Sequence, residues 1–276
     1  MTGPPRRNDP CPCGSGRRFK HCCGRPGSAA TTRAEGRKIS PFLELPDRVL
    51  AVPGFLDPEE CRRLVELADS LKSEDAAVTR HEAGALITSR SDYRITTTIK
   101  TFDQPDTFLP LIARALREHV EPGYQRRVEW FEWPDVLLYR AGGRYDLHTD
   151  ADLRDKGTGV WHRVMDRDFS VLIYLNDDFA GGQLAFPRRG ETIRPETGML
   201  VAFPSDHRFA HAALPVTGGR RYVIVTWAAV LGSPRVHERR RLQVVYPDRR
   251  TLPSGLPLRH IEGAGYVIMP RNQDPS

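Results

Sequence analysis

Two histidines and an aspartate form the pattern with the clearest chemical meaning in this chain of 276 residues. His148 and Asp150 are one residue apart and follow a predicted strand, so their side chains point to the same face. His211 comes later, directly before another predicted strand. Two imidazoles and a carboxylate suit a ferrous ion and leave coordination positions open for other ligands. We therefore predict an iron site at His148, Asp150 and His211.

An arginine pair at the start of the strand after His211 points to an anionic ligand. Arg221 and Trp227 share the same strand parity, whereas Arg220 faces the opposite side. A guanidinium that points into a barrel is an uncompensated buried charge unless an anion meets it. A dicarboxylate can supply that anion, because guanidinium and carboxylate pair through two parallel hydrogen bonds. We expect Arg221 to bind such a ligand. The alternative is an arginine pair on a solvated edge.

Three further residues of reactive type have simpler interpretations. His207 lies in a loop-like stretch and competes with His211 for the third iron position, but its distance to the arginine strand is greater. His162 lies in the long segment after Asp150, where a lid or surface position is expected. Cys61 has helical spacing from nearby leucines, so we expect a core residue rather than a reactive thiol.

Four cysteines near the N-terminus form a separate pattern. Cys11, Cys13, Cys22 and Cys23 give C-x-C, eight residues, then C-C. Four thiolates in so short a segment can close tetrahedrally around zinc, and the metal would supply the folding free energy that a small unit lacks. His21 could replace Cys22 as a ligand, and four unliganded cysteines are the remaining alternative.

Composition and charge allow several partners but favour a soluble class. The chain is 39% hydrophobic and 28% charged, with a formal net charge of +6 and a pI of about 9.2. This basic balance permits a nucleic-acid or acidic-protein partner, and a solvated basic surface is the simpler interpretation. No long apolar run or apolar N-terminal stretch occurs, so we predict no membrane span and a cytoplasmic location.

The elements that must position these residues change character along the chain. Asp57 and Pro58 predict a helix start, a second helix is expected over about 105–120, and residues 93–100 read as one strand. From Val128 onward, short β-rich runs alternate with turns, which favours an α+β fold with a sandwich or double-sheet barrel. The runs are Asp135–Tyr139, Ser170–Leu175, Gln183–Phe186, Gly198–Phe203 and Tyr222–Trp227.

The sequence predicts four parts of the chain. Residues 1–25 are the zinc-binding module, 26–40 a small and polar linker, and 41–230 the main domain with its motif core at 136–229. Residues 151–168 are long for a connection and could form a lid over a substrate. Residues 231–276 are an extension of unknown role that includes a possible short hairpin before Pro270.

Five segments resemble the prolyl 4-hydroxylase-like branch of the 2-oxoglutarate/iron(II) oxygenases. They occur in the family order as Tyr139–Asp150, Leu172–Asn176, Gly181–Pro187, Pro195–Gly198, and His211–Val216 followed by Arg221-Tyr222. The resemblance implies a double-stranded β-helix (jelly-roll) barrel supported by N-terminal helices. It also implies iron at His148, Asp150 and His211, 2-oxoglutarate at Arg221, and a possible use of ascorbate. Tyr139 matches a tyrosine that lines the cosubstrate or substrate pocket, and Tyr174 matches one that hydrogen-bonds the cosubstrate. The alternative for each is an ordinary core aromatic.

The cysteine pattern resembles the SEC-C zinc motif, which in its relatives is an interaction or targeting unit. The first hypothesis is therefore an oxygenase that hydroxylates a protein side chain such as proline and releases succinate and CO₂. In this hypothesis the zinc module recruits a protein or ribosomal target. The alternatives are a hydroxylase of a free amino acid or small metabolite, a nucleic-acid demethylase, and a barrel that binds a ligand without turnover.

Overall fold

A computed structural model describes Asn8, Arg18 and residues 43–75, 78–82, 85–89, 92–237, 243–252 and 258–268. The chain divides into two compact units, residues 1–40 and 41–276. The predicted zinc cysteines and the predicted linker lie outside the described residues. Within the described part, no helix is both long and apolar enough to cross a membrane.

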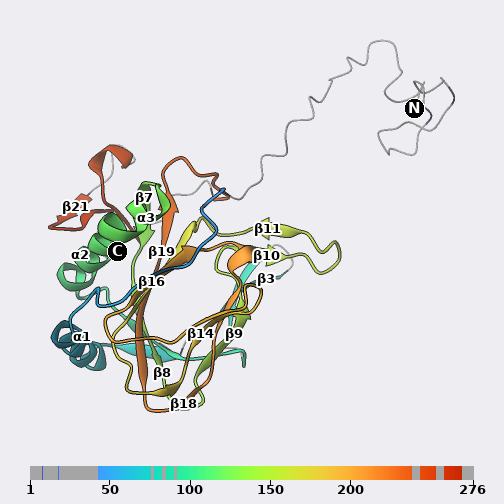
Figure 1. Cartoon of the computed structure of the whole chain (residues 1–276). Helices are drawn as coiled ribbons and strands as arrows, with labels where there is room; N and C mark the ends of the chain where they lie inside the picture. Colours follow the sequence, from blue (N-terminus) through green and yellow to red (C-terminus); the bar gives the residue numbers. More distant parts are fainter. Residues whose placement is uncertain are drawn as a thin grey trace, which may run out of the picture. The chain divides into compact units, whose positions relative to one another are not determined.

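One antiparallel sheet contains eleven of the described strands and forms one wall of the larger unit (Figure 1). Its order is β1-β16-β12-β19-β7-β20-β22-β21, and β8, β6 and β2 branch from β19. The bounds are β1 (Leu50–Val52), β2 (Ser73–Asp75), β6 (Thr97–Lys100), β7 (Val128–Glu132), β8 (Asp135–Tyr139), β12 (Phe169–Tyr174), β16 (Leu200–Pro204), β19 (Arg221–Val230), β20 (Val244–Tyr246), β21 (Leu258–Ile261) and β22 (Gly265–Ile268).

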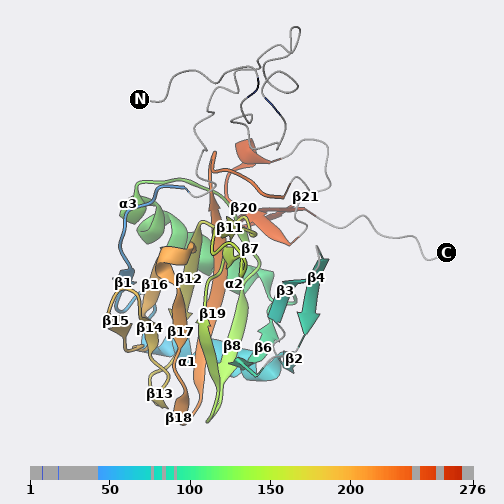
Figure 2. The same ribbon diagram turned by 90° about the vertical axis from the view of Figure 1, so that its right-hand side faces the viewer.

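A smaller sheet faces the inner side of the large one (Figures 1 and 2). Its order is β15-β14-β17-β9-β5, again antiparallel. Side chains from both sheets share one apolar cluster, for example Phe186 with Phe203 and Val223. This arrangement is consistent with the expected jelly roll. The strands are β5 (Arg94–Ile95), β9 (Arg144–His148), β14 (Leu184–Phe186), β15 (Glu191–Ile193) and β17 (His211–Ala213).

The central strands of the large sheet are buried on both faces, which explains their nearly continuous apolar sequences. Alternate residues of β19 pack in opposite directions: Val223 and Val225 join the inner cluster, whereas Tyr222 and Ile224 join the outer one. Inward-facing polar residues on such a strand therefore enter the space between the sheets.

Helices cover the outer face of the large sheet. The helices are α1 (Pro58–Ser70), α2 (Pro105–Ala115), the π-helical turn η2 (Leu116–Val120) and α3 (Glu121–Tyr124). The predicted helix start is confirmed, because the Asp57 side chain accepts a hydrogen bond from the Glu60 amide (2.8 Å) and Pro58 is the first helical residue. Cys61 is a fully buried core residue, as expected, and burial raises the pKa of its thiol to about 11.

The five predicted strands of the C-terminal half are confirmed to within two residues at their starts, but the single strand predicted over 93–100 is wrong. Residues 94–95 form β5, which pairs with β9, whereas Thr97–Lys100 forms β6, which pairs with β8 in the other sheet. Thr96 marks the change, and its hydroxyl donates to the Leu138 carbonyl (3.0 Å). A run of β-branched residues predicts extended backbone but carries no signal for a change of sheet.

Short hairpins and turns complete the described fold. The segment predicted as a lid contains a hairpin of β10 (Asp152–Arg154) and β11 (Trp161–Arg163). The C-terminal hairpin is present as β21 and β22, and β20 connects it to β7. The remaining elements are the pairs β3 (Val78–Glu82) with β4 (Ala85–Ser89) and β13 (Ala180–Gly181) with β18 (Val216–Gly218), and the 3₁₀ turns η3 (His207–Phe209) and η4 (Arg249–Thr251).

Candidate metal centre and adjoining cavity

A cavity of about 430 Å³ opens between the two sheets. Its walls combine apolar side chains with the residues that the sequence singled out, namely Tyr139, His148, Asp150, Tyr174, His211 and Arg221. The volume lies in the range of small-ligand sites. The structure therefore brings all six predicted residues of the main domain to one cavity.

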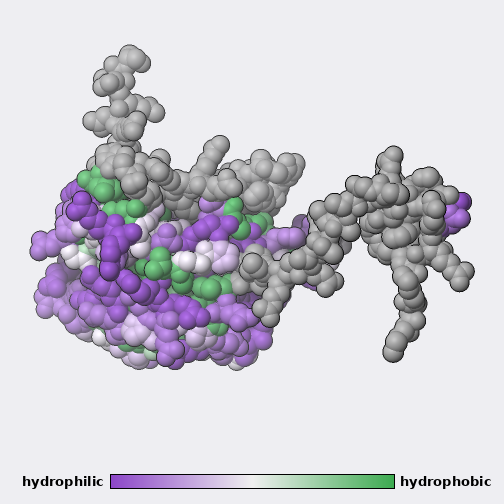
Figure 3. Space-filling model, turned by 90° about the horizontal axis from the view of Figure 1, so that it is seen from above, coloured by the Kyte–Doolittle hydropathy of each residue, from purple (hydrophilic) through white to green (hydrophobic). Residues whose placement is uncertain are grey.

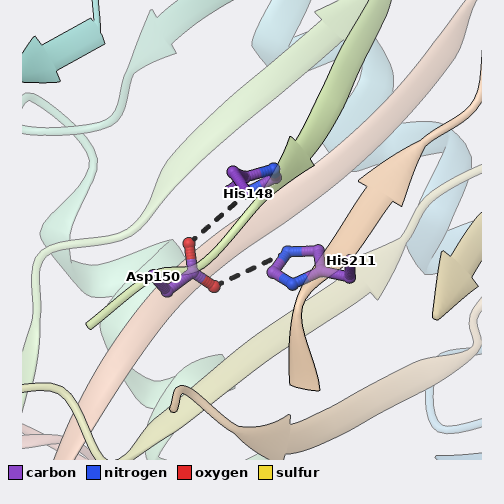
Figure 4. A group of neighbouring side chains, drawn as sticks. All are labelled: His148, Asp150 and His211. Carbon is purple, nitrogen blue, oxygen red and sulfur yellow. Dashed lines mark ion pairs between the residues drawn. The ribbon is translucent and has the colours of Figure 1, made fainter. Parts of the chain in front are cut away.

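His148, Asp150 and His211 converge at one part of this cavity (Figure 4). His148 ends β9, His211 begins β17, and these two residues are paired across the small sheet. The Nε2 atoms of His148 and His211 each lie 3.7 Å from an Asp150 carboxylate oxygen, and the three possible ligand atoms lie within 4.8 Å of one another. Three such donors on one side of a point can hold a metal ion and leave its other side open.

Hydrogen bonds orient both imidazole rings for this task. His148 Nδ1 lies 2.8 Å from the Asp146 carbonyl oxygen, and His211 Nδ1 lies 3.0 Å from the Phe209 carbonyl oxygen. A carbonyl oxygen only accepts, so each Nδ1 carries the proton and donates. The Nε2 lone pairs are then free and point toward Asp150. This is the usual arrangement of histidines that bind metal.

The protonation states also suit a metal. Burial lowers the pKa of His148 to about 3, and the neighbouring His211 adds to this effect. Burial alone would raise the pKa of Asp150, but His211, His148 and Arg167 outweigh it and lower the pKa to about 2. His148 is thus a neutral imidazole and Asp150 an ionised carboxylate, which are the forms that bind metal.

A second layer of contacts fixes the Asp150 carboxylate. The Ser170 hydroxyl donates to Asp150 Oδ2 (2.6 Å) and lies 2.8 Å from the Ser205 hydroxyl. Both serines are buried. Neither was predicted, because Ser170 lies 20 residues after Asp150 and Ser205 lies 35 residues after Ser170, and no recognisable motif links them.

An irregularity in β9 adds Tyr145 to the site. His211 pairs with His148 but Ala213 pairs with Tyr145, so β9 contains one extra residue in this interval. The bulge brings the Tyr145 and His148 rings into a stack, with centroids 3.5 Å apart and planes 12° apart. Alternation in the sequence would have placed these two side chains on opposite faces, so sequence reasoning missed Tyr145.

Arg221 also lines this cavity, and its guanidinium is a buried cation. Its side chain is 2% exposed, Nη1 donates to the Gly182 carbonyl, and the guanidinium lies 3.9 Å from the Tyr139 ring centroid. Among the described residues, no carboxylate pairs with Arg221, and its Nε has no hydrogen-bond partner. The Tyr174 hydroxyl is also buried and unpartnered, and burial raises its pKa to about 12. These donors fit an anion that enters the cavity.

Arg167 is a second cation at the cavity and was not predicted. Its Nε and Nη2 donate to the two carboxylate oxygens of Glu132 (2.8 and 2.7 Å), and its guanidinium lies 3.6 Å from the Trp227 ring centroid. Nη1 lies 3.4 Å from the Asp150 carbonyl oxygen. Unlike Arg221, Arg167 already has a carboxylate partner, so it orders this wall of the cavity.

The competing residues lie elsewhere. His207 is outside the three-residue group: Nδ1 lies 2.9 Å from Asp152 Oδ2, and the ring stacks on Trp161. His162 is exposed on β11, in agreement with the expectation. Arg220 faces outward, where its Nη1 lies 3.3 Å from Asp69 Oδ2.

The surface of the larger unit is mainly hydrophilic, and Figure 3 shows apolar patches between the hydrophilic side chains on the face seen from above. Leu147, Leu153 and Val160 are large exposed apolar residues, at 54%, 40% and 51% exposure. Leu147 precedes the metal-ligand candidate His148, Leu153 also lines the cavity, and Val160 directly precedes β11. Apolar surface is therefore available close to the cavity.

The chain matches two family models and several curated proteins. Residues 134–229 match the profile of the 2OG-Fe(II) oxygenase superfamily, and residues 7–25 match the SEC-C motif. Prolyl 3-hydroxylase 1 of Gallus gallus is 35% identical over 70% of this chain and 30% of its own length. Prolyl 4-hydroxylase subunit alpha-1 of Gallus gallus is 28% identical over 65% of this chain and 35% of its own length. The chain thus spans about a third or less of the curated relatives that it matches.

Solved structures support the fold. A Pseudomonas putida prolyl-4-hydroxylase aligns with a TM-score of 0.50 and 23% identity over 66% of this chain and 92% of its own. A Trichoplax adhaerens prolyl hydroxylase, solved with a hypoxia inducible factor peptide fragment, aligns with a TM-score of 0.51 and 18% identity over 69% and 87%. The predicted resemblance to the prolyl hydroxylase-like 2OG-Fe(II) oxygenases is confirmed, as is the resemblance of the N-terminal segment to the SEC-C motif.

Proposed function

We propose that this chain is an Fe(II)- and 2-oxoglutarate-dependent dioxygenase that hydroxylates a C–H bond of a protein side chain, with proline as the expected residue. In the balanced reaction, substrate, O₂ and 2-oxoglutarate give hydroxylated substrate, succinate and CO₂. One observation carries the proposal. A facial group of two imidazoles and a carboxylate shares a cavity with a buried arginine that has no carboxylate partner among the described residues.

The metal would be held by His148 Nε2, His211 Nε2 and the Asp150 carboxylate. The residues fit the ion, because both Nε2 lone pairs are free and the carboxylate remains ionised. When bound there, iron would couple the oxidation of 2-oxoglutarate to the transfer of one oxygen atom to the substrate. Ser170 and Arg167 would keep Asp150 in the orientation that leaves the open side toward the cavity.

The cosubstrate would bind through Arg221. Its guanidinium has the geometry to pair with the distal carboxylate of 2-oxoglutarate, and the Tyr174 hydroxyl can donate a further hydrogen bond. Tyr139 packs against the guanidinium and holds it in place. The apolar walls exclude water around this ion pair and so strengthen it.

The substrate class rests on the relatives. The names of the matching relatives include prolyl 3-hydroxylases and a prolyl 4-hydroxylase, so proline is the expected target and the position on the ring stays open. Exposed apolar residues near the cavity suit a polypeptide chain better than a small polar metabolite.

We also propose that Cys11, Cys13, Cys22 and Cys23 bind zinc and that this module recruits the protein or ribosomal target. The use of ascorbate and a cytoplasmic location stay predictions.

Turnover of 2-oxoglutarate tests the proposal. The purified chain, supplied with Fe(II), 2-oxoglutarate and O₂, should form succinate slowly alone and faster with proline-containing peptides. Mass spectrometry should then find one added oxygen on the peptide. His148→Ala should abolish both signals, whereas His162→Ala, an exposed histidine outside the group, should preserve them. A variant His148→Ala with unchanged turnover would refute the assignment, and omission of ascorbate tests its use.

A further inference from the structure

The last residue of β19 and the segment that follows it, residues 230–237, are here named the clasp and contact the polypeptide directly before β12. Asp168 is the centre of these contacts and is 3% exposed. Its Oδ2 accepts hydrogen bonds from the Val230 amide (2.8 Å) and the Ser233 hydroxyl (2.7 Å). Its Oδ1 accepts from Arg163 Nη1 (2.8 Å) at the end of the β10–β11 hairpin. One buried carboxylate therefore joins the clasp to the hairpin that follows the metal site.

Two more contacts hold the clasp in place. The buried Asp166 carboxylate accepts hydrogen bonds from the amides of Val236 (2.7 Å) and His237 (3.2 Å). Arg235 forms an ion pair with Glu129 on β7, and its Nη1 lies 3.5 Å from Asp168 Oδ2. The clasp is thus bound on one side to residues 163–168 and on the other to β7.

The residues on either side of Asp168 contact the candidate metal ligand Asp150. Arg167, directly before it, reaches the Asp150 backbone and is itself held by Glu132 of β7. Ser170, two residues after it, donates to the Asp150 carboxylate. The Asp168 backbone adds a third connection, because its carbonyl accepts from the Ser205 amide (2.9 Å) and the Ser205 carbonyl accepts from the Ala151 amide (3.1 Å).

We infer that Asp168 is a positioning residue, through which the clasp fixes the orientation of Asp150 and thereby the affinity of the metal site. The inference rests on the proposed function only for its kinetic readout. It assigns a role to part of the region beyond residue 230, for which the sequence pattern gave none. Residues that orient metal ligands typically change metal affinity or activity by about 10- to 100-fold when they are replaced.

Asp168→Asn is the main test, made in the full chain. Both Asp168 oxygens accept hydrogen bonds, so an asparagine must turn its NH₂ group toward a donor on one side. Co(II) titration, followed by visible absorbance, is made on metal-free protein in which Cys11, Cys13, Cys22 and Cys23 are replaced by serine, so that Co(II) does not bind at the proposed zinc module. It should show an affinity loss of about 10-fold or more. With Fe(II), kcat should fall, whereas the KM for 2-oxoglutarate should stay within about twofold because the Arg221 contacts are untouched.

Asp248→Asn is the matched control. Asp248 also accepts from arginines, Arg127 and Arg250, but it does not line the cavity. Its replacement should leave Co(II) affinity unchanged. If Asp168→Asn does not fold, Ser233→Ala tests the inference instead. This variant removes one hydrogen bond to Asp168 and keeps the Asp168 carboxylate. It should weaken Co(II) binding about threefold.

Wild-type Co(II) affinity in Asp168→Asn, or in Ser233→Ala where only that variant folds, would overturn the inference even if the melting temperature fell. The proposed function fails separately. Wild-type protein that binds Co(II) but forms no succinate would refute the oxygenase assignment and leave the affinity comparison intact.

Discussion

Replacement of Arg221 by methionine separates ligand binding from fold stability. The guanidinium is buried, stacks on Tyr139, donates to the Gly182 carbonyl, and has no carboxylate partner among the described residues. In the proposed complex its partner is the distal carboxylate of 2-oxoglutarate. Arg221→Met keeps an apolar side chain of similar length and removes the charge and all its donors.

The expected loss of affinity follows from the hydrogen bonds removed. A hydrogen bond to a charged group contributes about 1.5–3 kcal/mol, so the loss of two such bonds costs about 3 kcal/mol or more. This corresponds to an increase of about 100-fold in the KM for 2-oxoglutarate. The metal-free, ligand-free protein should behave differently. In that state, removal of an unpaired buried charge stabilises the fold, which offsets the lost contacts of Arg221 with Tyr139 and Gly182. The free energy of unfolding should therefore change by less than about 1 kcal/mol.

Two measurements on one preparation test this reasoning: succinate formation as a function of 2-oxoglutarate concentration, and urea unfolding of the metal-free protein. Arg220→Met is the matched control, because this neighbour is 51% exposed and pairs with Asp69 outside the cavity. Its KM should equal that of the wild type. A wild-type KM in Arg221→Met would refute the assignment of the cosubstrate site. A large loss of stability would refute the claim that this cation is uncompensated in the free protein.

Three further predictions concern the metal site and the N-terminal module. Ser170→Ala removes the 2.6 Å hydrogen bond to Asp150 and should weaken Co(II) binding about 10-fold, measured by absorbance titration; unchanged affinity would contradict the orienting role. Burial lowers the pKa of His148 from 6.5 to about 3. Between pH 7 and pH 5 His148 therefore becomes protonated in the unfolded chain but stays neutral in the folded chain. The free energy of unfolding of the metal-free protein, measured by urea titration, should fall by about 2 kcal/mol over this range. His148→Gln should make the free energy of unfolding depend less on pH in this range. An unchanged pH dependence would contradict the role of His148. Deletion of residues 1–25 should leave peptide-independent succinate formation unchanged but lower turnover of a protein target; equal turnover would count against recruitment.

Local sequence was sufficient for much of the fold. Short β-rich runs separated by turn residues predicted the central strands, and an Asp-Pro pair predicted the start of α1 at Pro58. Strand parity alone selected Arg221 over Arg220, and the structure places these two side chains on opposite faces. These features depend on residues close together in the chain, where side-chain direction follows directly from backbone period.

Features that depend on strand pairing were not predictable. The change of sheet at Thr96 and the bulge that stacks Tyr145 on His148 both arise from how distant strands pair. The pairing of Arg167 with Glu132 likewise joins residues that are 35 positions apart. No periodicity in the sequence records such pairings.

The amino-acid sequence was enough to predict the chemical groups of the site: two imidazoles, a carboxylate and an inward-facing arginine, in the order found in one enzyme family. How these groups are held became clear from the folded chain. Ser170 and Arg167 contact Asp150, and Asp168 connects both of their positions to a segment more than sixty residues further along the chain. The physical reason is that side-chain chemistry is local, whereas the orientation of a ligand depends on hydrogen bonds between segments that folding alone brings together.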